Sequence, residues 1–399
     1  MAGDLAERFR ALWDEIAPVG RDAGSGGYLR YALTEPELRL RDWYREQAGR
    51  RGLPVTEDGN GNLFAWWGDP DAGDAVLTGS HFDSVPHGGA YDGPLGIVSA
   101  FLAVDELRAA GVTPARPVVL GAFVEEEGAR FGVPCLGSRL LTGALTPERA
   151  AALRDADGVG FAEALGHPPA GARPELLGRF RCFVELHVEQ GRALADTAAP
   201  VAVASAIWPH GRWRFDFTGE GNHAGTTRMA DRHDPMLTYA FTVLAANKEA
   251  RLRGAHATVG RVSVEPNATN AIPSRVTGWL DARAAEPDTL AGLVEAVRDK
   301  TVERARRDGT GVTLTEESAT PLVAFDGGLA GRLAELLDAP VLPTGAGHDA
   351  GVLAAYLPTA MLFVRNPTGV SHSPAESATD DDCAAGVAAL ARVLEELAC

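Results

Sequence analysis

One stretch, residues 77–96, constrains the fold of this chain more than any other. A short apolar run leads into it, five glycines, two aspartates and two histidines lie within it, and an apolar helical pattern over residues 97–107 follows. This order predicts a buried strand, a glycine-rich loop and a helix, and α/β proteins bind ligands where strands end in such loops. A loop so rich in glycine has few side chains to bury in a core. Histidine and carboxylates on such a loop therefore favour a metal site. The alternative at this point is an ordinary loop with a surface histidine and capping aspartates.

The length and composition describe a globular protein with more than one domain. The chain has 399 residues, more than the roughly 250–300 residues at which single hydrophobic cores stop growing. Its hydrophobic fraction of 45% and charged fraction of 23% are those of an ordinary globular protein. A formal net charge of -17 offers no basic surface for nucleic acid or for an anionic membrane. We therefore expect a small-molecule or peptide substrate.

No sequence feature indicates secretion or a membrane span. The first ten residues are charged and amphipathic rather than apolar, and no apolar run reaches the roughly 18 residues of a transmembrane helix. The four cysteines lack CxxC spacing, which indicates neither a disulfide framework nor a zinc knuckle. A cytoplasmic protein is expected.

The order of strand and helix patterns predicts an α/β domain interrupted by a second domain. Strands and helices alternate in residues 1–205 and again in 317–399, and the run 117–124 is apolar enough for a strand buried on both faces. Residues 147–166 read as an alanine-rich helical segment. Residues 206–316 instead read strand, helix, strand, strand, helix, strand with half-buried alternation, which is typical of a small antiparallel α+β module. The expected domains are thus 1–205 with 317–399, and an inserted domain, 206–316.

Candidate metal ligands stand at four predicted strand ends of the larger domain. They are His81 with Asp92, the pair Glu126 and Glu127, His187, and His372. Imidazole nitrogen and carboxylate oxygen suit zinc, manganese and similar ions, and two such ions close together need a shared carboxylate to offset their repulsion. Asp92 is the natural bridge. A lone histidine at a strand end is more often structural, but four such sites flanked by glycine together indicate a metal centre.

The adjacent glutamates Glu126 and Glu127 suggest a catalytic base. Neighbouring carboxylates at a strand end repel each other unless a cation holds one of them. One glutamate can then ligate a metal while the other, pointing the opposite way, takes a proton from bound water. A solvated acidic loop is the alternative, although the apolar run 117–124 delivers the pair into the interior.

The inserted domain carries further polar candidates. His223 lies among small residues and suits an oxyanion donor, provided that the domain closes over the metals. Asn267 and Asn270 offer two amides, and Arg283 offers a guanidinium that can hold a carboxylate bidentately. For any one of these residues a turn cap or a surface ion pair is the commoner role.

Eight motifs, in order along the chain, resemble those of the M20-type dinuclear metallohydrolases. They are Gly-Ser-His-Phe-Asp-Ser-Val (79–85), Gly-Ala-Tyr-Asp-Gly-Pro-Leu-Gly (89–96), Glu-Glu-Gly-Ala-Arg-Phe (126–131), Glu-Leu-His-Val-Glu-Gln-Gly (185–191), Asn-His-Ala-Gly-Thr-Thr (222–227), Pro-Asn-Ala-Thr-Asn-Ala-Ile-Pro (266–273), Gly-Ala-Gly-His-Asp-Ala (345–350) and Val-Ser-His-Ser-Pro-Ala-Glu (370–376). Within that family the chain is most similar to the branch of allantoate amidohydrolases, N-carbamoyl-L-amino-acid hydrolases and β-ureidopropionases. The resemblance implies an α/β fold with a mixed central sheet flanked by helices, and an inserted ferredoxin-like α+β domain that serves as lid and dimerisation domain.

The resemblance also implies roles for individual residues. One metal ion would be held by His81, Asp92 and His187, and the other by Asp92, Glu127 and His372. Behind His81, Asp83 would orient its imidazole, and Glu126 would be the general base. The substrate would be contacted by His223 near the scissile group, by Asn270 and Arg283 at its carboxylate, and by Gln190. No role falls to His87, the second histidine of the glycine-rich loop.

These matches imply a two-metal amidohydrolase that cleaves the ureido (N-carbamoyl) group of a small carboxylate. Allantoate is the first expectation, with release of ammonia and carbon dioxide, and N-carbamoyl-L-amino acids are the second. A dinuclear exopeptidase would share nearly every ligand, although related aminopeptidases usually carry a carboxylate where His187 stands. A non-catalytic binding protein would be expected to lack a metal ligand or Glu126. The metals would be zinc or manganese, with cobalt or nickel as alternatives, and the family is commonly homodimeric through the inserted domain.

Three places depart from the family pattern. Glu125 stands where asparagine is common, Arg228 stands where proline is common, and the segment 207–212, with Trp208 and His210, replaces a Gly-Ile-x-Gly-like entry into the inserted domain. None of them is an implied metal ligand. They leave the substrate open, because the pocket rim is expected to include some of them.

Overall fold

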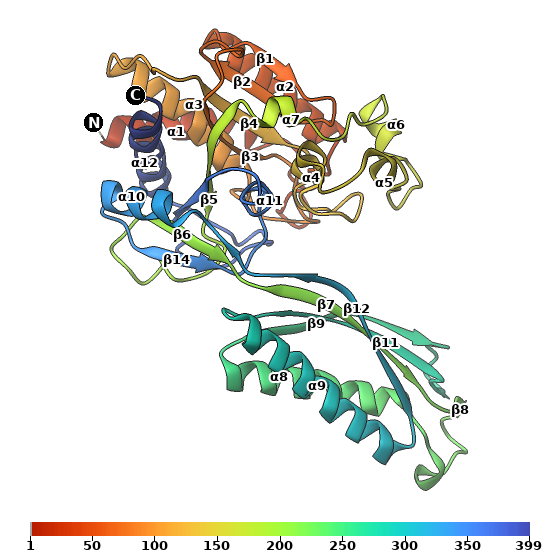
Figure 1. Cartoon of the computed structure of the whole chain (residues 1–399). Helices are drawn as coiled ribbons and strands as arrows, with labels where there is room; N and C mark the ends of the chain where they lie inside the picture. Colours follow the sequence, from red (N-terminus) through yellow and green to blue (C-terminus); the bar gives the residue numbers. More distant parts are fainter. Residues whose placement is uncertain (1) are drawn as a thin grey trace. The chain divides into compact units, whose positions relative to one another are not determined.

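The computed structural model describes residues 2–399 and divides into two compact units (Figure 1). The larger unit comprises the chain up to Ser205 together with Ala324–Cys399, and the smaller, inserted unit comprises Ala206–Val323. The inserted unit extends past residue 316, where the sequence pattern placed its end, because its last long strand keeps pairing as far as Thr320. No helix in residues 2–399 is long and apolar enough to cross a membrane.

The larger unit is built on a nine-stranded mixed sheet. Its strands are β1 (Val55–Glu57), β2 (Leu63–Trp67), β3 (Ala75–His81), β4 (Val118–Phe123), β5 (Phe180–Val188), β6 (Val201–Ile207), β13 (Val323–Ala324), β14 (Val341–Thr344) and β15 (Thr359–Val364). They lie in the order β1-β2-β4-β3-β5-β15-β6-β13, with β14 beside β6. The central strands β4, β3, β5 and β15 are parallel, whereas β2 and β6 flank them antiparallel. The expected mixed central sheet is confirmed.

Helices bury both faces of this sheet. They are α1 (Ala2–Ile16), α2 (Glu35–Arg50), α3 (Pro94–Ala109), α4 (Leu136–Thr142), α5 (Pro147–Ala151), α6 (Phe161–Leu165), α7 (Pro174–Leu177), α10 (Gly327–Leu337), α11 (Asp349–Leu353) and α12 (Asp380–Ala398). Along β5, Val184 and Leu186 join the core shared with α1, α3 and α12. On the other face Glu185 accepts a hydrogen bond from the backbone amide of Ala350 in α11. A strand covered on both faces can be apolar at every position, which is why the run 117–124 forms β4.

The single helical segment expected over residues 147–166 is wrong, because α5 and α6 are separate helices with a turn between them. In that turn the Asp155 carboxylate accepts hydrogen bonds from the backbone amides of Asp157 and Val159, at 3.0 and 2.9 Å. An aspartate that binds nearby amides in this way stabilises a turn at the expense of helix.

The inserted unit is an antiparallel sheet with two helices on one face. Its elements are β7 (His210–Thr218), β8 (Asn222–His223), α8 (Pro235–Arg253), β9 (His256–Glu265), β10 (Ala271–Ile272), β11 (Arg275–Arg283), α9 (Pro287–Asp308) and β12 (Gly311–Thr320). The main sheet has the order β12-β7-β11-β9, and β8 pairs with β10 separately. Trp213, Phe215 and Phe217 alternate along β7 toward a core shared with α8 and α9, and polar residues occupy the opposite face. This order of strands and helices is the expected ferredoxin-like arrangement.

Candidate metal centre

The candidate ligands of the larger unit meet at one edge of its sheet, where the parallel strands end. β3 ends at His81, and β5 carries His187 next to its last residue. The loop after β4 carries Glu126 and Glu127, and the loop after β15 carries His372. Because parallel strands end at the same edge, these loops converge where α/β sheets bind ligands.

The first cluster consists of His81, Asp92 and His187, whose ligand atoms lie within 4.8 Å of one another. The Asp92 Oδ1 atom is 3.6 Å from His81 Nε2 and 3.2 Å from His187 Nε2. The two Nδ1 atoms lie 3.0 Å from the carbonyl oxygen of Asp83 and 2.9 Å from that of Val188, respectively. A carbonyl can only accept, so each Nδ1 donates a hydrogen bond, which leaves Nε2 as the ligand atom for a cation. Both Nε2 atoms are buried and have no hydrogen-bond partner among the described residues, as expected of atoms suited to a cation.

The second cluster consists of Asp92, Glu127 and His372. The His372 Nε2 atom is 3.3 Å from Asp92 Oδ2 and 3.5 Å from Glu127 Oε2. The two oxygens of Asp92 therefore face different histidines, which fits a carboxylate shared by two cations. Gln190 also lies here, since its amide nitrogen donates to Asp92 Oδ2 at 2.8 Å.

The glycine-rich loop is shaped to bring Asp92 to His81. Gly93 has a φ of 88°, and a Cβ atom there would lie 2.5 Å from the imidazole of His81. Only glycine fits both the backbone conformation and this close approach. The Glu376 carboxylate accepts hydrogen bonds from the backbone amides of Tyr91 and Asp92, at 2.8 and 3.0 Å, and so holds the loop in place.

Glu126 and Glu127 point to different parts of the centre. The Glu126 carboxylate is buried and its Oε2 atom is 3.7 Å from His81 Nε2, whereas Glu127 faces His372. The backbone amides of the two glutamates donate to the two oxygens of Asp83, at 3.1 and 3.0 Å. Asp83 thus contacts His81 through its carbonyl oxygen, while its carboxylate, 3.6 Å from that imidazole, positions the glutamates.

Negative charge is concentrated at the centre. Burial, with Asp349 and Glu127 nearby, raises the pKa of Glu126 well above its usual value, and burial with Asp92 nearby raises that of Glu127 to about 7. Burial alone would also raise the pKa of Asp92, but the three histidines that face it hold that pKa well below the usual value. Carboxyl groups that resist ionisation at neutral pH mark a site with a deficit of positive charge. Divalent cations would supply that charge.

Sequence reasoning missed three further buried groups around His187. Glu185 and His348 have ligand atoms within 4.8 Å of those of His187, and the rings of His187 and His348 lie 4.5 Å apart. His348 Nε2 and Asp349 Oδ2 are buried without a hydrogen-bond partner in the part of the chain described. The signal for all three was their place inside the motifs 185–191 and 345–350. His87, in contrast, is exposed and bonds Ser25, outside both clusters.

In the inserted unit, His223 and Asn270 are neighbours. His223 pairs with Ala271 across β8 and β10, and the amide of Ala224 donates to the carbonyl of Asn270 at 2.9 Å. His223 Nδ1 accepts from the backbone amide of Gly225 at 3.0 Å, so the neutral imidazole carries its proton on Nε2. An exposed Nε2–H is the donor that an oxyanion requires.

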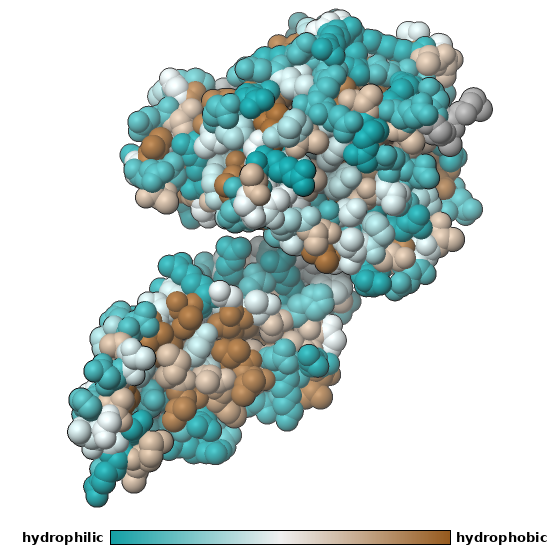
Figure 2. Space-filling view, turned by 180° about the vertical axis from the view of Figure 1, so that it is seen from behind, coloured by the Kyte–Doolittle hydropathy of each residue, from teal (hydrophilic) through white to brown (hydrophobic). Residues whose placement is uncertain are grey.

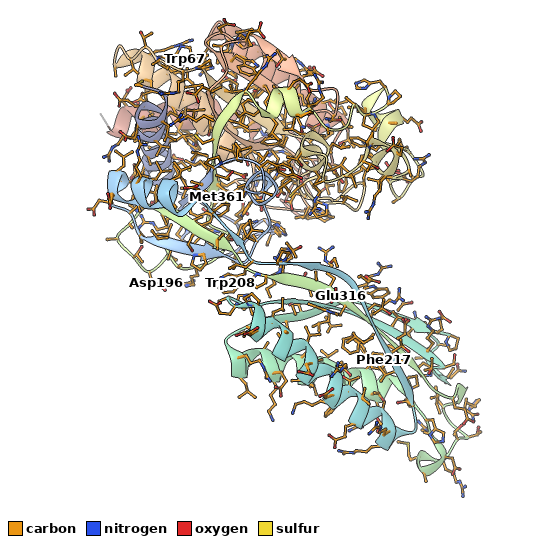
Figure 3. The ribbon with its side chains drawn as sticks, in the orientation of Figure 1. Trp67, Asp196, Trp208, Phe217, Glu316 and Met361 are labelled. Atoms are coloured by element: carbon orange, nitrogen blue, oxygen red, sulfur yellow. The ribbon has the colours of Figure 1, made fainter. Side chains whose placement is uncertain are left out.

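Arg283 lies at the other end of the inserted sheet from these two residues. β11 begins at Arg275, close to β10, and ends at Arg283. Eight residues of strand place the two ends about 27 Å apart. Figure 3 labels Trp208, just before the start of the neighbouring strand β7, and Phe217, near the end of that strand. Within one chain, therefore, Arg283 cannot bind the same small ligand as His223 and Asn270.

Buried imidazole and carboxylate groups that form candidate cation sites, with a buried glutamate beside them, suit hydrolysis by activated water. This is the chemistry of a metal-dependent hydrolase. Residues 77–396 match the sequence model of Peptidase family M20/M25/M40, and the chain belongs to this family.

Curated relatives indicate which type of hydrolase this chain is. The chain is 38% identical to N-carbamoyl-L-amino acid amidohydrolase of Geobacillus stearothermophilus, over 97% of this chain and 98% of the relative. It is 31% identical to allantoate amidohydrolase of Escherichia coli (strain K12), over 99% of both chains. The crystal structure of an amidase of the hydantoinase/carbamoylase family from Burkholderia multivorans superposes with a TM-score of 0.86 at 32% identity, covering 99% of this chain and 98% of that one. The chain is therefore an amidohydrolase that acts on carbon–nitrogen bonds other than peptide bonds.

Proposed function

We propose that this enzyme hydrolyses the ureido group of a small carboxylate, allantoate being the substrate that we name first, and releases ammonia and carbon dioxide. One observation carries the proposal. The Nε2 atoms of His81 and His187 are buried, have no hydrogen-bond partner among the described residues and lie 3.6 and 3.2 Å from one oxygen of Asp92. Two imidazole nitrogens and a carboxylate oxygen gathered in this way form a ligand set for a divalent cation.

The two clusters would hold two divalent cations per chain, one at His81, Asp92 and His187 and one at Asp92, Glu127 and His372. Mixed imidazole and carboxylate ligands suit zinc or manganese, and also cobalt or nickel. When bound, such ions polarise a carbonyl group and lower the pKa of water.

The chain's own residues would handle protons and bind the substrate. Glu126, buried beside His81, takes the proton of the attacking water and passes it to the leaving nitrogen. His223 donates from Nε2 to the oxygen of the attacked carbonyl group. Asn270 and Arg283 bind the substrate carboxylate, and Gln190 adds a contact beside Asp92.

The enzyme would act as a homodimer joined through the inserted unit. Arg283 lies about 27 Å along the sheet from His223 and Asn270 of the same chain. A substrate bound by Arg283 would therefore be contacted by His223 and Asn270 of the partner chain. In the inserted unit the outer edge of β9 has no strand beside it, and an open edge invites pairing with another chain. Leu244 and Leu252 of α8 are 71% and 69% exposed. Figure 2 shows apolar side chains gathered on one face of this unit.

An ammonia-release assay tests the proposed function. The panel contains allantoate, ureidoglycolate, N-carbamoyl-β-alanine, several N-carbamoyl-L-amino acids and, as the negative set, dipeptides, each with added zinc or manganese. We expect release from at least one ureido acid and no cleavage of dipeptides. Cleavage of dipeptides alone would overturn the proposal, as would full turnover by Glu126→Gln.

N-carbamoyl-L-amino acids are the second candidate substrates. The observation in their favour is the identity of 38% to the N-carbamoyl-L-amino acid amidohydrolase, against 31% to the allantoate amidohydrolase. The ratio of kcat/KM for the two substrate types in the same assay decides between them. For either substrate we propose the cytoplasm as the place of action.

A further inference from the structure

The segment 207–212, which departs from the family pattern, places a histidine beside Arg283. His210 of β7 and His256 of β9 are the direct cross-strand partners of Arg283 in β11. Directly paired residues project from the same face of a sheet, and this is the polar face, because the next residues of β7, Gly211 and Trp213, turn into the core. Arg283 thus has a histidine as its direct partner on each of the two neighbouring strands.

The hydrogen bonding of His210 defines what its free nitrogen can do. Its Nδ1 atom lies 3.0 Å from the carbonyl oxygen of Trp208 and therefore carries the proton. Burial, together with the charge of Arg283, lowers the pKa of His210 below its usual value, so the imidazole is neutral at neutral pH. Its Nε2 atom then presents a lone pair and can only accept. Within the inserted unit that atom makes no hydrogen bond.

Asp281 fixes the orientation of the Arg283 guanidinium. It lies two residues before Arg283 on the same face of β11, and its two oxygens accept from Arg283 Nε at 2.9 Å and from a terminal nitrogen at 3.2 Å. Although burial acts in the opposite direction, the hydrogen bond and charge of Arg283 hold the pKa of Asp281 below its usual value, so the pair stays ionised. A guanidinium held by two parallel hydrogen bonds has a defined orientation.

The geometry points to His210 as a specificity-determining residue, whose Nε2 accepts a hydrogen bond from the N–H group on the carbon that bears the substrate carboxylate. The inference rests on the proposed function, because it takes Arg283 as the residue that binds the carboxylate. In allantoate and in N-carbamoyl α-amino acids, a ureido N–H and the carboxylate are attached to the same carbon atom. A cation and a neutral acceptor side by side match that pair of groups. A substrate without the N–H leaves the Nε2 lone pair without a partner, which costs binding energy.

Two substrates that differ by one methyl group test this inference. N-carbamoylglycine carries the N–H, and N-carbamoylsarcosine has a methyl group in its place. We expect His210→Phe to lower kcat/KM about fivefold to tenfold for N-carbamoylglycine, the usual effect of one neutral hydrogen bond, and to leave N-carbamoylsarcosine nearly unchanged. His210→Gln, which keeps an acceptor oxygen, should restore most of the loss. His256→Phe is the matched control, because it alters the other cross-strand neighbour of Arg283 and should leave the preference between the two compounds intact.

The outcomes separate the inference from the proposed function. If the wild-type enzyme hydrolyses N-carbamoylglycine but His210→Phe lowers kcat/KM equally for both compounds, His210 is merely structural and the inference is wrong. If the wild type hydrolyses neither compound, the proposed function is in question, and calorimetric titration of N-carbamoylglycine into metal-loaded wild type and His210→Phe decides the inference. Binding at least fivefold tighter to the wild type supports it, and equal or undetectable binding overturns it.

Discussion

The separation of His223 from Arg283 predicts that two inactive variants restore each other. About 27 Å of strand lies between the ends of the sheet that carry them, so each active site would combine Arg283 of one chain with His223 of the other. His223→Ala removes an oxyanion donor, a loss of about 10²- to 10³-fold in kcat. Arg283→Ala removes the cation that binds the carboxylate, which should raise KM and lower kcat/KM by a similar factor. Each variant alone should therefore be nearly inactive.

A heterodimer of the two variants has one repaired site. The His223→Ala chain keeps Arg283 and receives His223 from its neighbour, whereas the other site lacks both side chains. Random mixing gives half heterodimers with one working site in two, so the mixture should recover about 25% of wild-type activity. The assay is ammonia release before and after co-refolding, with dimer formation followed by size-exclusion chromatography. A mixture that forms dimers but stays as inactive as its components would show that both residues act within one chain and would refute the argument from strand length.

Three further predictions concern the larger unit. Gly93→Ala should abolish metal binding, measured by metal analysis after dialysis, because the added Cβ atom would lie 2.5 Å from the His81 imidazole at a φ of 88°; a variant with full metal content would contradict this. Glu126→Gln should keep its metal content and lose about 10²- to 10⁴-fold in kcat, and a loss of metal instead would reassign Glu126 as a ligand. In the metal-free protein burial raises the pKa of Asp349 from 3.8 to about 8. Between these two pH values the folded state keeps a proton on Asp349 that the unfolded state has released, so Tm should fall as the pH rises from about 4 to about 8. A Tm that instead rises with pH across that range would argue against Asp349 as the cause of the pH dependence. So would an Asp349→Asn variant whose Tm falls with pH as steeply as that of the wild type.

Much of the fold follows from local patterns in the sequence. The apolar run that forms β4 correctly indicated a strand buried on both faces, and the half-buried alternation along β7 correctly indicated an antiparallel insert. The mixed order of the central sheet was implied by the family resemblance alone. The end of the insert was placed too early because β12 is mostly exposed and its weak alternation gives little signal. The helix expected over 147–166 failed because the turn at Asp155 depends on side-chain hydrogen bonds rather than on hydrophobic period.

The candidate ligands could be found because each stands at the end of an apolar strand or in the loop that follows it, and the structure brings all five of them into two clusters. The metal-binding role of these five residues stays a prediction. His348 escaped notice because a single histidine carries no signal until the fold sets it against His187. The contact between His81 and Asp83 runs through a backbone carbonyl, which any residue type could supply. Sequence spacing also cannot tell that His223 and Arg283 occupy opposite ends of one sheet, because that depends on strand pairing.

The inserted unit has a hydrophobic core of its own, formed by Trp213, Phe215 and Phe217 with residues of α8 and α9. The clusters of imidazole and carboxylate groups belong to a different core, in the larger unit. Substitutions on the polar face of the insert, at His210 for instance, are therefore expected to leave both the hydrophobic core of the insert and the metal-ligand clusters of the larger unit intact. For a protein engineer, the positions of that face other than Arg283 and Asp281 are the ones to randomise first when a new substrate is sought.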